Sequence, residues 1–343
     1  MKKLLNVLYV QTEGAYLRLD HETVVMEVEG KVVRQMPLHP LAAIAVYGNV
    51  MVSPHLIAKC VKEGRSIAFF DTLGHYQFRI EGPVSGNVLL RKSQYEAFFD
   101  RSRLVSIARN LLAGKLQNCR QVLLRGAREA EDDGSQETLR LSAEYHADSL
   151  KRLEKESDPD MIRGIEGMAA SSYFSSLPFL IRVRDSRLKF EGRTRRPPRD
   201  PVNALLSYIY TLLRFDCESA LEGVGLDPQV GYLHTLRPGR PALALDLMEE
   251  LRPIMADRLA LTLLNRAQVT FSDFEERPGG SVFLNEKGRK TVIMAWQEKK
   301  KEELNHPVLG KKVPYGLLPH IQARLLARHL RGDVAEYTPF VWR

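Results

Sequence analysis

Residues 76–99 read YQFRIEGPVSGNVLLRKSQYEAFF, and the hydrophobic periodicity of the chain changes within this stretch. Before it, apolar residues alternate as they do in half-buried strands. After it, they recur about every 3.5 residues, which is typical of amphipathic helices. The segment EGPVSG at 81–86 lies between, with two glycines, a proline and no periodicity. This change predicts an α+β fold of two domains, residues 1–86 and 87–343.

The N-terminal domain is expected to be a small β-sheet domain. Apolar residues alternate along 15–19, and Glu29-Gly30 separates two β-branched runs as a hairpin turn would. The segments SIAFFD and YQFRI within 66–80 predict another strand pair. One short helix is expected between Ser53, a suitable N-cap followed by proline, and Gly64.

The C-terminal domain is expected to be larger and all-helical. One long helix should run from Val88 to Gly114, with a charged loop at 131–136. Asp158-Pro159 and Asp200-Pro201 then have the sequence of helix starts, because a capping carboxylate precedes a proline. Three further helical stretches follow, at 253–266, 289–303 and 316–332.

The composition is that of an ordinary globular protein, with 343 residues, 27% charged and 44% hydrophobic. The three cysteines are far apart and form no CxxC pair, which argues against a disulfide framework or a cysteine-based zinc site. The opening MKKLLNVLYV lacks a small-residue cleavage site and predicts a first strand rather than a signal peptide. Because no stretch approaches the roughly 18 apolar residues of a membrane span, we expect a cytoplasmic protein.

Positive charge is concentrated at residues 182–199. This run, RVRDSRLKFEGRTRRPPR, holds eight basic and two acidic side chains, in a chain whose formal net charge is +8. Such clustering is typical of surfaces that bind the phosphate backbone of nucleic acid. A flexible, solvated basic loop explains the charge equally well.

The stretch GYLHTLRPGRPALALDLMEELRP at 231–253 combines a histidine with acids in a leucine-rich run. His234 precedes a Pro/Gly/Arg turn, and Asp246, Glu249 and Glu250 follow. If the run is helical, the leucines lie on one face and the acids on the opposite face. Like charges three and four residues apart repel slightly, so either solvent or a cation should lie against the acidic face.

Two explanations therefore stay open for these acids. In the first, they lie on a solvated helix surface, where Glu249 pairs with Arg252. In the second, a cation binds there and His234 supplies a nitrogen ligand. One histidine and two carboxylates suit Mg²⁺ or Mn²⁺ better than zinc, because hard cations favour oxygen ligands.

Glu166 lies in a second unusual context, between Gly164 and Gly167 in a segment otherwise rich in alanine, serine and aromatic residues. Each glycine in a helix costs roughly 1 kcal/mol relative to alanine. Close approach of a neighbouring helix, through Gly167, Ala170 and Ser171, would explain the glycines. Close approach of a bulky ligand such as a nucleic-acid backbone would explain them as well.

Four segments, in this order, carry a resemblance to a known family: GIEGMAASSYFSSL at 164–177, DPVNALLSYIYTLL at 200–213, the stretch at 231–253, and LNR at 264–266. With GNVLLRKSQYEAF at 86–98, they are similar to the motifs of the CRISPR-associated adaptation integrase (Cas-one) family. The resemblance covers essentially the whole chain, and its form is nearest to the type I-C branch.

The resemblance implies an N-terminal β domain that mediates dimerisation and a helical domain that holds a divalent metal. The family's metal-binding glutamate and histidine match Glu166 and His234, and its third acidic ligand matches Glu249, where some members have aspartate. Asp246 matches a second acidic position, for which we expect a supporting role or a transient second metal site. Glu250 has no match and is expected to be solvated or salt-bridged.

The reaction implied by the resemblance is transesterification with Mg²⁺ or Mn²⁺ as cofactor. The 3′-hydroxyl of a short double-stranded DNA fragment, a prespacer, would attack a phosphodiester of the CRISPR repeat beside the leader. Associated DNA endonuclease activity is expected. The partners would be this DNA, a second copy of the chain in a homodimer, and the small adaptation protein Cas-two bridging two dimers.

Several basic residues are candidates for contacts with DNA phosphates, namely Arg193, Arg195, Arg196, Arg237 and Arg240. For Arg252 and Arg258, salt bridges on a helix surface explain the charge equally well. Tyr173 is expected in the core. The histidines without a nearby carboxylate pattern are expected to be structural or exposed; these are His306, His320 and His329.

Three other functions are compatible with parts of the sequence. A metal-dependent nuclease without sequence preference would use the same residues to direct water at a phosphate. A non-catalytic DNA-binding scaffold would explain the basic run at 182–199, but it gives no role to Glu166 or His234. A plain helical interaction protein leaves the whole His/carboxylate pattern unexplained.

Overall fold

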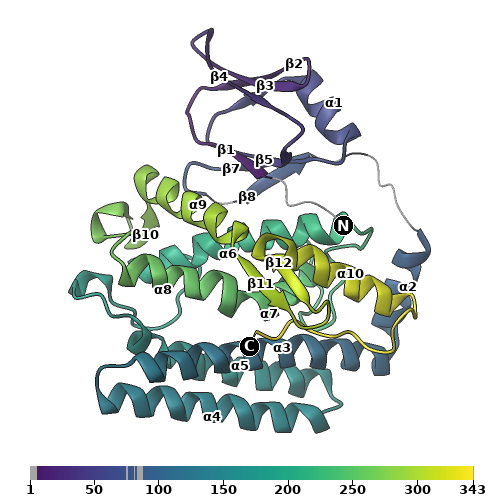
Figure 1. Ribbon diagram of the computed structural model, residues 1–343, viewed down its shortest axis with the longest axis vertical. Helices are drawn as coiled ribbons and strands as arrows, with labels where there is room; N and C mark the ends of the chain where they lie inside the picture. The colour runs from purple at the N-terminus through teal and green to yellow at the C-terminus, as the bar shows by residue number, and fades with distance from the viewer. Residues whose placement is uncertain (1–5, 75, 81, 83–87, 343) are drawn as a thin grey trace. The chain divides into compact units, whose positions relative to one another are not determined.

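The computed structural model (Figure 1) describes residues 6–74, 76–80, 82 and 88–342. The chain divides into two compact units, Met1–Ser85 and Gly86–Arg343. The boundary that the sequence predicts at 81–86 lies outside the described residues except for Gly82. The α+β class is confirmed, since strands dominate the first unit and helices the second.

Two four-stranded sheets make up most of the first unit in the part of the chain described. One sheet has the order β1-β5-β7-β8, in which β1, β5 and β7 run parallel and β8 pairs antiparallel to β7. The other has the order β4-β3-β2-β6. The strands are β1 Asn6–Val10, β2 Tyr16–Asp20, β3 Thr23–Val28, β4 Lys31–Pro37, β5 Leu41–Tyr47, β6 Met51–Val52, β7 Ser66–Phe70 and β8 Tyr76–Ile80.

The turn, helix and strand pair predicted for this unit are confirmed. Glu29 and Gly30 have φ values of 51° and 75° between antiparallel β3 and β4, as a two-residue hairpin turn requires. Helix α1, Pro54–Lys62, starts at Ser53, whose side chain accepts the N–H of Leu56. β7 and β8 form the expected antiparallel pair.

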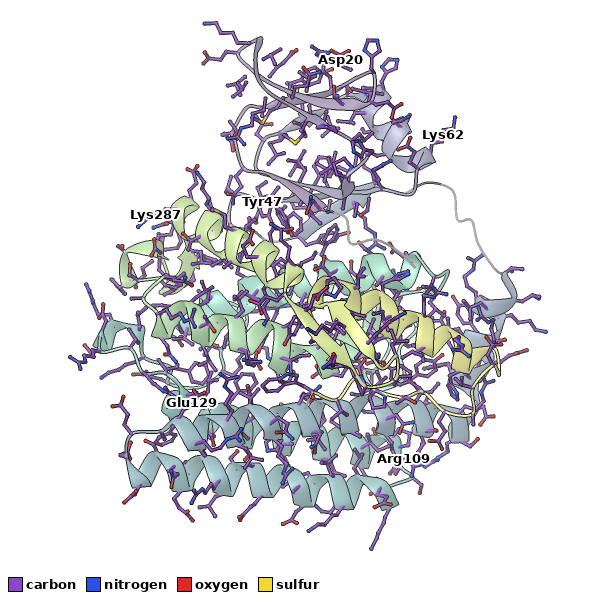
Figure 2. The ribbon with its side chains drawn as sticks, in the orientation of Figure 1. Asp20, Tyr47, Lys62, Arg109, Glu129 and Lys287 are labelled. Carbon is purple, nitrogen blue, oxygen red and sulfur yellow. The ribbon has the colours of Figure 1, made fainter. Side chains whose placement is uncertain are left out.

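The core of the first unit is formed by aliphatic side chains from both sheets and α1. Leu17 of β2, Ile44 of β5, Leu56 of α1 and Ile67 of β7 are fully buried. Burial contributes about 1.5–3 kcal/mol for each such side chain. Charged side chains such as Lys62 are exposed instead (Figure 2).

The second unit is mostly helical. Its longer helices are α2 Val88–Phe99, α3 Arg101–Glu129, α4 Asp133–Lys155, α5 Pro159–Ser176, α6 Pro201–Glu222, α7 Ala242–Leu251, α8 Arg258–Asn265, α9 Glu286–Lys301 and α10 Leu318–Leu330. One π-helical turn, η3 Arg252–Asp257, joins α7 to α8. Short 3₁₀ turns are η1 Leu177–Leu180, η2 Ser186–Leu188, η4 Phe271–Asp273 and η5 Tyr315–Leu317. Across the residues described, no helix is long and apolar enough to cross a membrane.

The long helix α3 brings together segments that are far apart in the sequence. It packs along α4 and also contacts α5 and α7 (Figure 1). α7 in turn contacts α6, α10 and η3. Because it has neighbours on several sides, α7 has little surface left for solvent, and this determines the environment of its acidic residues.

The predicted helix starts at Asp158 and Asp200 are confirmed. Each aspartate accepts a backbone N–H of the helix that follows, and each helix has proline at its start. The charged loop expected at 131–136 is only partly right. Asp132 caps α4 by accepting the N–H of Ser135, so the helix begins inside the expected loop.

The single helix expected from Val88 to Gly114 is wrong. The chain breaks at Asp100, whose side chain accepts the N–H groups of Ser102 and Arg103 and thereby starts α3. The apolar periodicity continues across this break, so periodicity alone does not reveal it.

Gly114 does not end a helix but lies in the middle of α3. A Cβ atom added there would lie 2.8 Å from Cβ of Pro339 and 3.0 Å from Cβ of Glu250. The glycine therefore permits close approach of α7 and of a later segment to α3, which is a different use of glycine from a helix cap.

The expectation of an all-helical second domain is also wrong, because two short antiparallel hairpins occur in it. They pair β9 Phe274–Arg277 with β10 Ser281–Leu284, and β11 Glu303–His306 with β12 Lys311–Pro314. Gly279 and Gly280, both with positive φ, form the turn of the first hairpin. Strands of four residues give too few alternations for a periodicity signal.

Candidate functional site

The three acids of α7 are all buried, so of the two explanations left open by the sequence, the solvated helix surface is wrong. Asp246 and Glu250 are fully buried and Glu249 is 3% exposed. Burying a carboxylate costs several kcal/mol unless charges or hydrogen bonds compensate. Each of the three has a different set of partners, and these sets distinguish their roles.

Glu249 is surrounded by cationic side chains. Its Oε1 atom is 2.7 Å from the guanidinium of Arg252, which confirms the predicted pairing, and its Oε2 atom is 2.6 Å from Nζ of Lys115. Burial alone would raise the pKa of Glu249, but the charges of Arg252, Lys115 and His234 outweigh it and lower the pKa. Glu249 is therefore a carboxylate anion.

Lys115, on α3, connects two predicted ligands. Its ammonium group contacts Glu249 and also donates a hydrogen bond to Oε1 of Glu166 on α5. The lysine side chain is 8% exposed, whereas that of Glu166 is 26% exposed. Burial lowers the pKa of Lys115, but the charges of Glu249 and Glu166 more than compensate and raise it. Two carboxylates from different helices thus meet at one positive charge.

His234 contacts two of the acids through different ring nitrogens. Its Nδ1 atom is 2.7 Å from Oδ1 of Asp246, and its Nε2 atom is 3.9 Å from Oε1 of Glu249. Burial lowers the pKa of His234, but the hydrogen bond and charge of Asp246 and the charge of Glu249 raise it overall. An imidazole whose Nδ1 is held by a carboxylate has its Nε2 oriented as a potential ligand.

Asp246 also fixes the backbone of the loop that carries His234. Its carboxylate accepts the N–H groups of Tyr232, Leu233 and His234 at 2.5, 3.0 and 2.9 Å. A Cβ atom on Gly231 would lie 2.7 Å from Oδ2 of Asp246, so the loop can approach α7 this closely only with glycine there. Asp246 therefore holds both the imidazole and the backbone of this loop.

Glu250 points to a set of neutral donors instead. It accepts hydrogen bonds from the Tyr337 hydroxyl at 2.5 Å, the Phe340 N–H at 2.7 Å and the Gln322 amide at 3.1 Å. Burial raises the pKa of Glu250 to about 7, against the opposing effect of these hydrogen bonds. The expectation that Glu250 is solvated or salt-bridged is wrong, because a later segment of the chain covers it.

Asn118 of α3 holds the same later segment from the other side. Its Nδ2 donates to the carbonyl oxygens of Glu250 and Phe340 at 2.7 and 2.9 Å, and its Oδ1 accepts the N–H of Trp342 at 2.7 Å. The guanidinium of Arg258 lies 4.2 Å from the ring centre of Trp342. Tyr337 and Phe340 of this segment are buried and belong to the core beside α7.

The π-helical turn η3 directs two further polar side chains toward the site. Arg252 stacks 4.3 Å over the ring of Tyr210 while it pairs with Glu249. The Tyr210 hydroxyl donates to Asp257 at 2.5 Å. Single π-helical turns occur often at functional sites, because they re-aim side chains within a helix. No pattern in the sequence indicated this turn.

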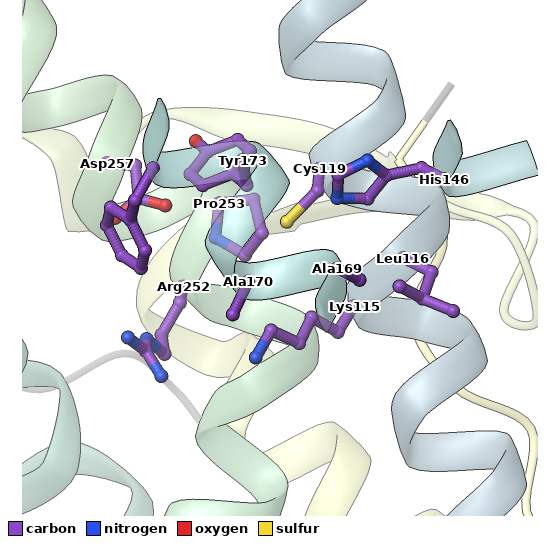
Figure 3. A pocket seen from close by; sticks show the side chains of 11 residues that line it. Lys115, Leu116, Cys119, His146, Ala169, Ala170, Tyr173, Arg252, Pro253 and Asp257 are labelled. Carbon is purple, nitrogen blue, oxygen red and sulfur yellow. The ribbon is translucent and has the colours of Figure 1, made fainter. Parts of the chain in front are cut away.

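A small cavity lies behind the site (Figure 3). Lys115 and Arg252 extend along it from α3 and η3, and His146, Tyr173 and Asp257 are among the residues that line it. Tyr173 is 2% exposed, so its expected place in the core is confirmed.

The donor set fits a hard divalent cation, although the ammonium of Lys115 contacts two of its three members. In the part of the chain described, no three His, Cys, Asp or Glu side chains form a ready metal site. The ammonium of Lys115 instead marks the point where Glu166 and Glu249 converge, with Nε2 of His234 on the far side of Glu249. Two carboxylates and one imidazole are ligands that Mg²⁺ and Mn²⁺ accept.

The glycines beside Glu166 face open space. A Cβ atom on Gly164 or on Gly167 would meet nothing within 4 Å. Helix packing through Gly167 and Ser171 is therefore wrong within this chain, because both residues are exposed. The two glycines therefore leave open space on α5 beside Glu166.

Four of the five predicted phosphate-binding arginines gather in one place. Arg195, Arg196 and Arg237 are exposed and Arg240 is half-buried. Burial and the charges of Arg237, Arg196 and Arg195 lower the pKa of Arg240, whereas the charge of Asp246 raises it. The other three arginines are therefore near enough for their charges to act on Arg240, which lies in the loop after His234.

The fifth arginine, Arg193, has a structural environment. Its guanidinium donates to Asn203 at 2.6 Å, to the Thr194 carbonyl at 2.7 Å and to Ser207 at 3.2 Å. It also lies 5.3 Å from the ring centre of Tyr210. Arg193 thus anchors the basic run to α6, although the charge of Arg195 also acts on it. His306 and His329 are buried, as expected for structural histidines.

Comparisons with known proteins bear on the family of the chain. Residues 8–298 match the family model described as CRISPR associated protein Cas1. The chain is 55% identical, over 100% of both lengths, to a protein of Moorella thermoacetica named CRISPR-associated endonuclease Cas1 1. It matches the structure of a CAS1 protein from Thermotoga maritima with a TM-score of 0.81 and 26% identity, covering 96% of this chain and 97% of that one.

A casposase bound to its integration product shares the fold, with a TM-score of 0.83 and 20% identity over 99% of this chain and 95% of that one. This second likeness concerns the fold alone. The family model and the full-length relative together show that the chain belongs to the Cas1 family of CRISPR-associated proteins.

Proposed function

We propose that this protein is a metal-dependent DNA integrase of CRISPR adaptation. It joins the 3′-hydroxyl ends of short double-stranded DNA fragments to the CRISPR array by transesterification, and has associated endonuclease activity. The observation that carries the proposal is that Glu166 and Glu249 converge on one cationic position, with Nε2 of His234 3.9 Å from the other oxygen of Glu249 and several arginines nearby.

The ligands of the cation would be Glu166, Glu249 and Nε2 of His234, with Mg²⁺ or Mn²⁺ as the ion. A bound ion of this kind would supply a lowered pKa for the attacking hydroxyl and stabilisation of charge on the phosphoryl oxygens. Asp246 orients the imidazole through Nδ1 and holds its loop against α7. Arg252 keeps Glu249 ionised and in place.

The DNA would approach over the open face of α5. Gly164 and Gly167 leave space beside Glu166, so a sugar-phosphate backbone can come close to the ligands. The four clustered arginines, Arg195, Arg196, Arg237 and Arg240, would neutralise its phosphates. Positioning of the hydroxyl and the phosphodiester by these contacts is the main contribution that this chain makes to an in-line displacement.

The names of structural neighbours support the DNA and protein partners. One neighbour is a casposase bound to integration product, and another is a Cas6-RT-Cas1–Cas2 complex. By analogy, we expect this chain to bind prespacer and repeat DNA and to assemble, as a homodimer formed through residues 1–86, with a small Cas2 (Cas-two) partner. The motif order favours the type I-C branch, and three free buried cysteines suit the cytoplasm.

One assay separates integration from simple DNA cleavage. The protein, its Cas2 partner and Mn²⁺ are incubated with fragments bearing 3′-hydroxyl ends and a supercoiled plasmid that carries the array. Fragments covalently joined at the first repeat are the expected result. Shortened DNA without joining would favour the alternative of a metal-dependent nuclease.

Two variants test whether the site is catalytic. Glu166→Ala and His234→Ala should each abolish joining, while binding of the fragments, measured by fluorescence anisotropy, largely persists. If both variants joined fragments at the wild-type rate, the protein would be a non-catalytic DNA-binding scaffold.

A further inference from the structure

Lys115 is a buried cation with two anionic partners from separate helices. Its side chain is 8% exposed, and its ammonium contacts Glu166 on α5 and Glu249 on α7. A buried ammonium is costly unless it is paired, and here both of its partners are predicted metal ligands. Its position is therefore not that of an ordinary surface lysine on an amphipathic helix.

We infer that Lys115 is the internal counter-ion of the candidate metal site. Its ammonium neutralises Glu166 and Glu249 when no metal is bound, and it must leave at least one of them when a divalent cation binds. This inference rests on the proposed function, because it assumes that these carboxylates are the ligands.

The charges around Glu249 support a competition between the lysine and a metal ion. Oε1 of Glu249 already pairs with Arg252, and Oε2 pairs with Lys115. A divalent ion bound to Glu166 and Glu249 would need the oxygens that Lys115 now contacts. It would also lie within a few ångströms of an ammonium, and like charges at such distances repel strongly in a buried site.

Lys115 reaches its two partners through a flexible side chain that lies beside a small cavity. The cavity of Figure 3 runs along the lysine and is lined on another side by the small residues Ala169 and Ala170. The four-carbon stem of lysine is flexible, so the ammonium can shift without movement of α3. Glu166 is the more exposed of its two partners and can be approached from solvent.

Competition has a consequence that a purely structural ion pair does not have. If binding of the metal must break the contacts of Lys115, removal of the ammonium should tighten metal binding and weaken the metal-free protein. If Lys115 only holds the two carboxylates in position, its removal should weaken metal binding or leave it unchanged.

The test compares Mn²⁺ binding by the wild type, Lys115→Met and Lys300→Met, measured by calorimetry and by electron paramagnetic resonance. Lys300 is a matched control, because it is also buried and pairs with Asp216 at 2.8 and 2.9 Å, outside the site. We expect the dissociation constant of Lys115→Met to fall at least about tenfold. Its metal-free melting temperature should fall, and Mn²⁺ should raise it by more than in the wild type. Lys300→Met should be destabilised with unchanged Mn²⁺ affinity.

An unchanged or weaker Mn²⁺ affinity of Lys115→Met, with normal binding by the wild type, would overturn the inference and leave the proposed function intact. Failure of the wild type itself to bind Mn²⁺ would overturn both. If Lys115→Met does not fold, a wild-type crystal soaked in Mn²⁺ decides. We expect an anomalous peak at the carboxylates, with Nζ of Lys115 more than about 4 Å from at least one of them. A bound ion with Lys115 still on both carboxylates would contradict the inference.

Discussion

Glu249 and Glu250 are neighbours on α7 and are equally buried, yet they face opposite environments. Glu249 is surrounded by Arg252, Lys115 and His234, and its pKa is lowered. Glu250 meets only a hydroxyl, an amide and a backbone N–H, and burial raises its pKa to about 7. The first is a charge paired with cations, and the second accepts hydrogen bonds from a later segment of the chain. Residue type and burial alone do not reveal this difference, since the partners decide it.

The largest expected effect separates the two glutamates directly. Glu249→Gln keeps the shape of the side chain but removes a charge at the candidate site, so we expect the joining rate on an array plasmid to fall about 10²–10³-fold. Glu250→Gln should cost about 1–3 kcal/mol in stability, because its amide cannot accept all three donors. Its joining rate should stay close to wild type, and an equal loss of joining in both variants would contradict the comparison.

The next largest effect tests whether Asp246 acts at the candidate metal site, as proposed for Glu249, or only stabilises the fold, as proposed for Glu250. Asp246→Asn should disturb the His234 ring and its loop, since an amide cannot accept every N–H that the carboxylate accepts. We expect Mn²⁺ affinity and joining to fall about 10- to 100-fold. Calorimetry with Mn²⁺, alongside Glu250→Gln as the control, measures this, and wild-type affinity in Asp246→Asn would assign Asp246 to folding alone.

A smaller effect is expected for a substitution that disturbs the packing of α3 against Glu250 and the later segment that covers it. Gly114→Ala places a Cβ atom 2.8 Å from Cβ of Pro339 and 3.0 Å from Cβ of Glu250, so the segment around Pro339 must shift. We expect a loss of about 1–3 kcal/mol in the free energy of unfolding. Urea denaturation gives the value, and a stabilised variant would show that the contact with α3 is not tight.

The smallest effect is expected for the same glycine-to-alanine substitution at two positions on the open face of α5. Gly164→Ala and Gly167→Ala meet no atom within 4 Å, so helix propensity should stabilise each variant by up to about 1 kcal/mol. Joining should nevertheless decrease, because the added methyl group lies where DNA is proposed to approach. Melting temperatures and joining rates measured on the same preparations check the expected gain in stability and the expected loss of joining. Unchanged joining would contradict the proposal that DNA approaches over this face of α5.

Local signals in the sequence predicted much of the fold and part of the site. Asp158 and Asp200 lie next to the helices that they cap, so a short window of sequence contains the whole interaction. The break at Asp100 was missed, because apolar periodicity continues across it. The sequence predicts Glu166, His234 and Glu249 as ligands; in the structure Lys115 contacts both glutamates, and His234 lies 3.9 Å from the other oxygen of Glu249.

The missed parts of the site depend on long-range contacts. Lys115 lies 51 residues before Glu166, and nothing in its own segment distinguishes it from other lysines on an amphipathic helix. The partners of Glu250 and Asn118 are more distant still: Asn118 and Phe340 are 222 residues apart. Such contacts depend on how helices pack, which the periodicity of a single helix does not specify.

The covering of Glu250 by a later segment also affects when α7 can reach its final environment during synthesis. Its donors Gln322, Tyr337 and Phe340 follow it by 72, 87 and 90 residues. At a synthesis rate of roughly 5–20 residues per second, about 5–18 s pass between the synthesis of Glu250 and that of Phe340. During this interval α7 cannot bury Glu250 with its donors in place. The helix that carries Glu249 therefore reaches its final environment late in translation, and a ribosome-bound chain does not have the assembled site before then.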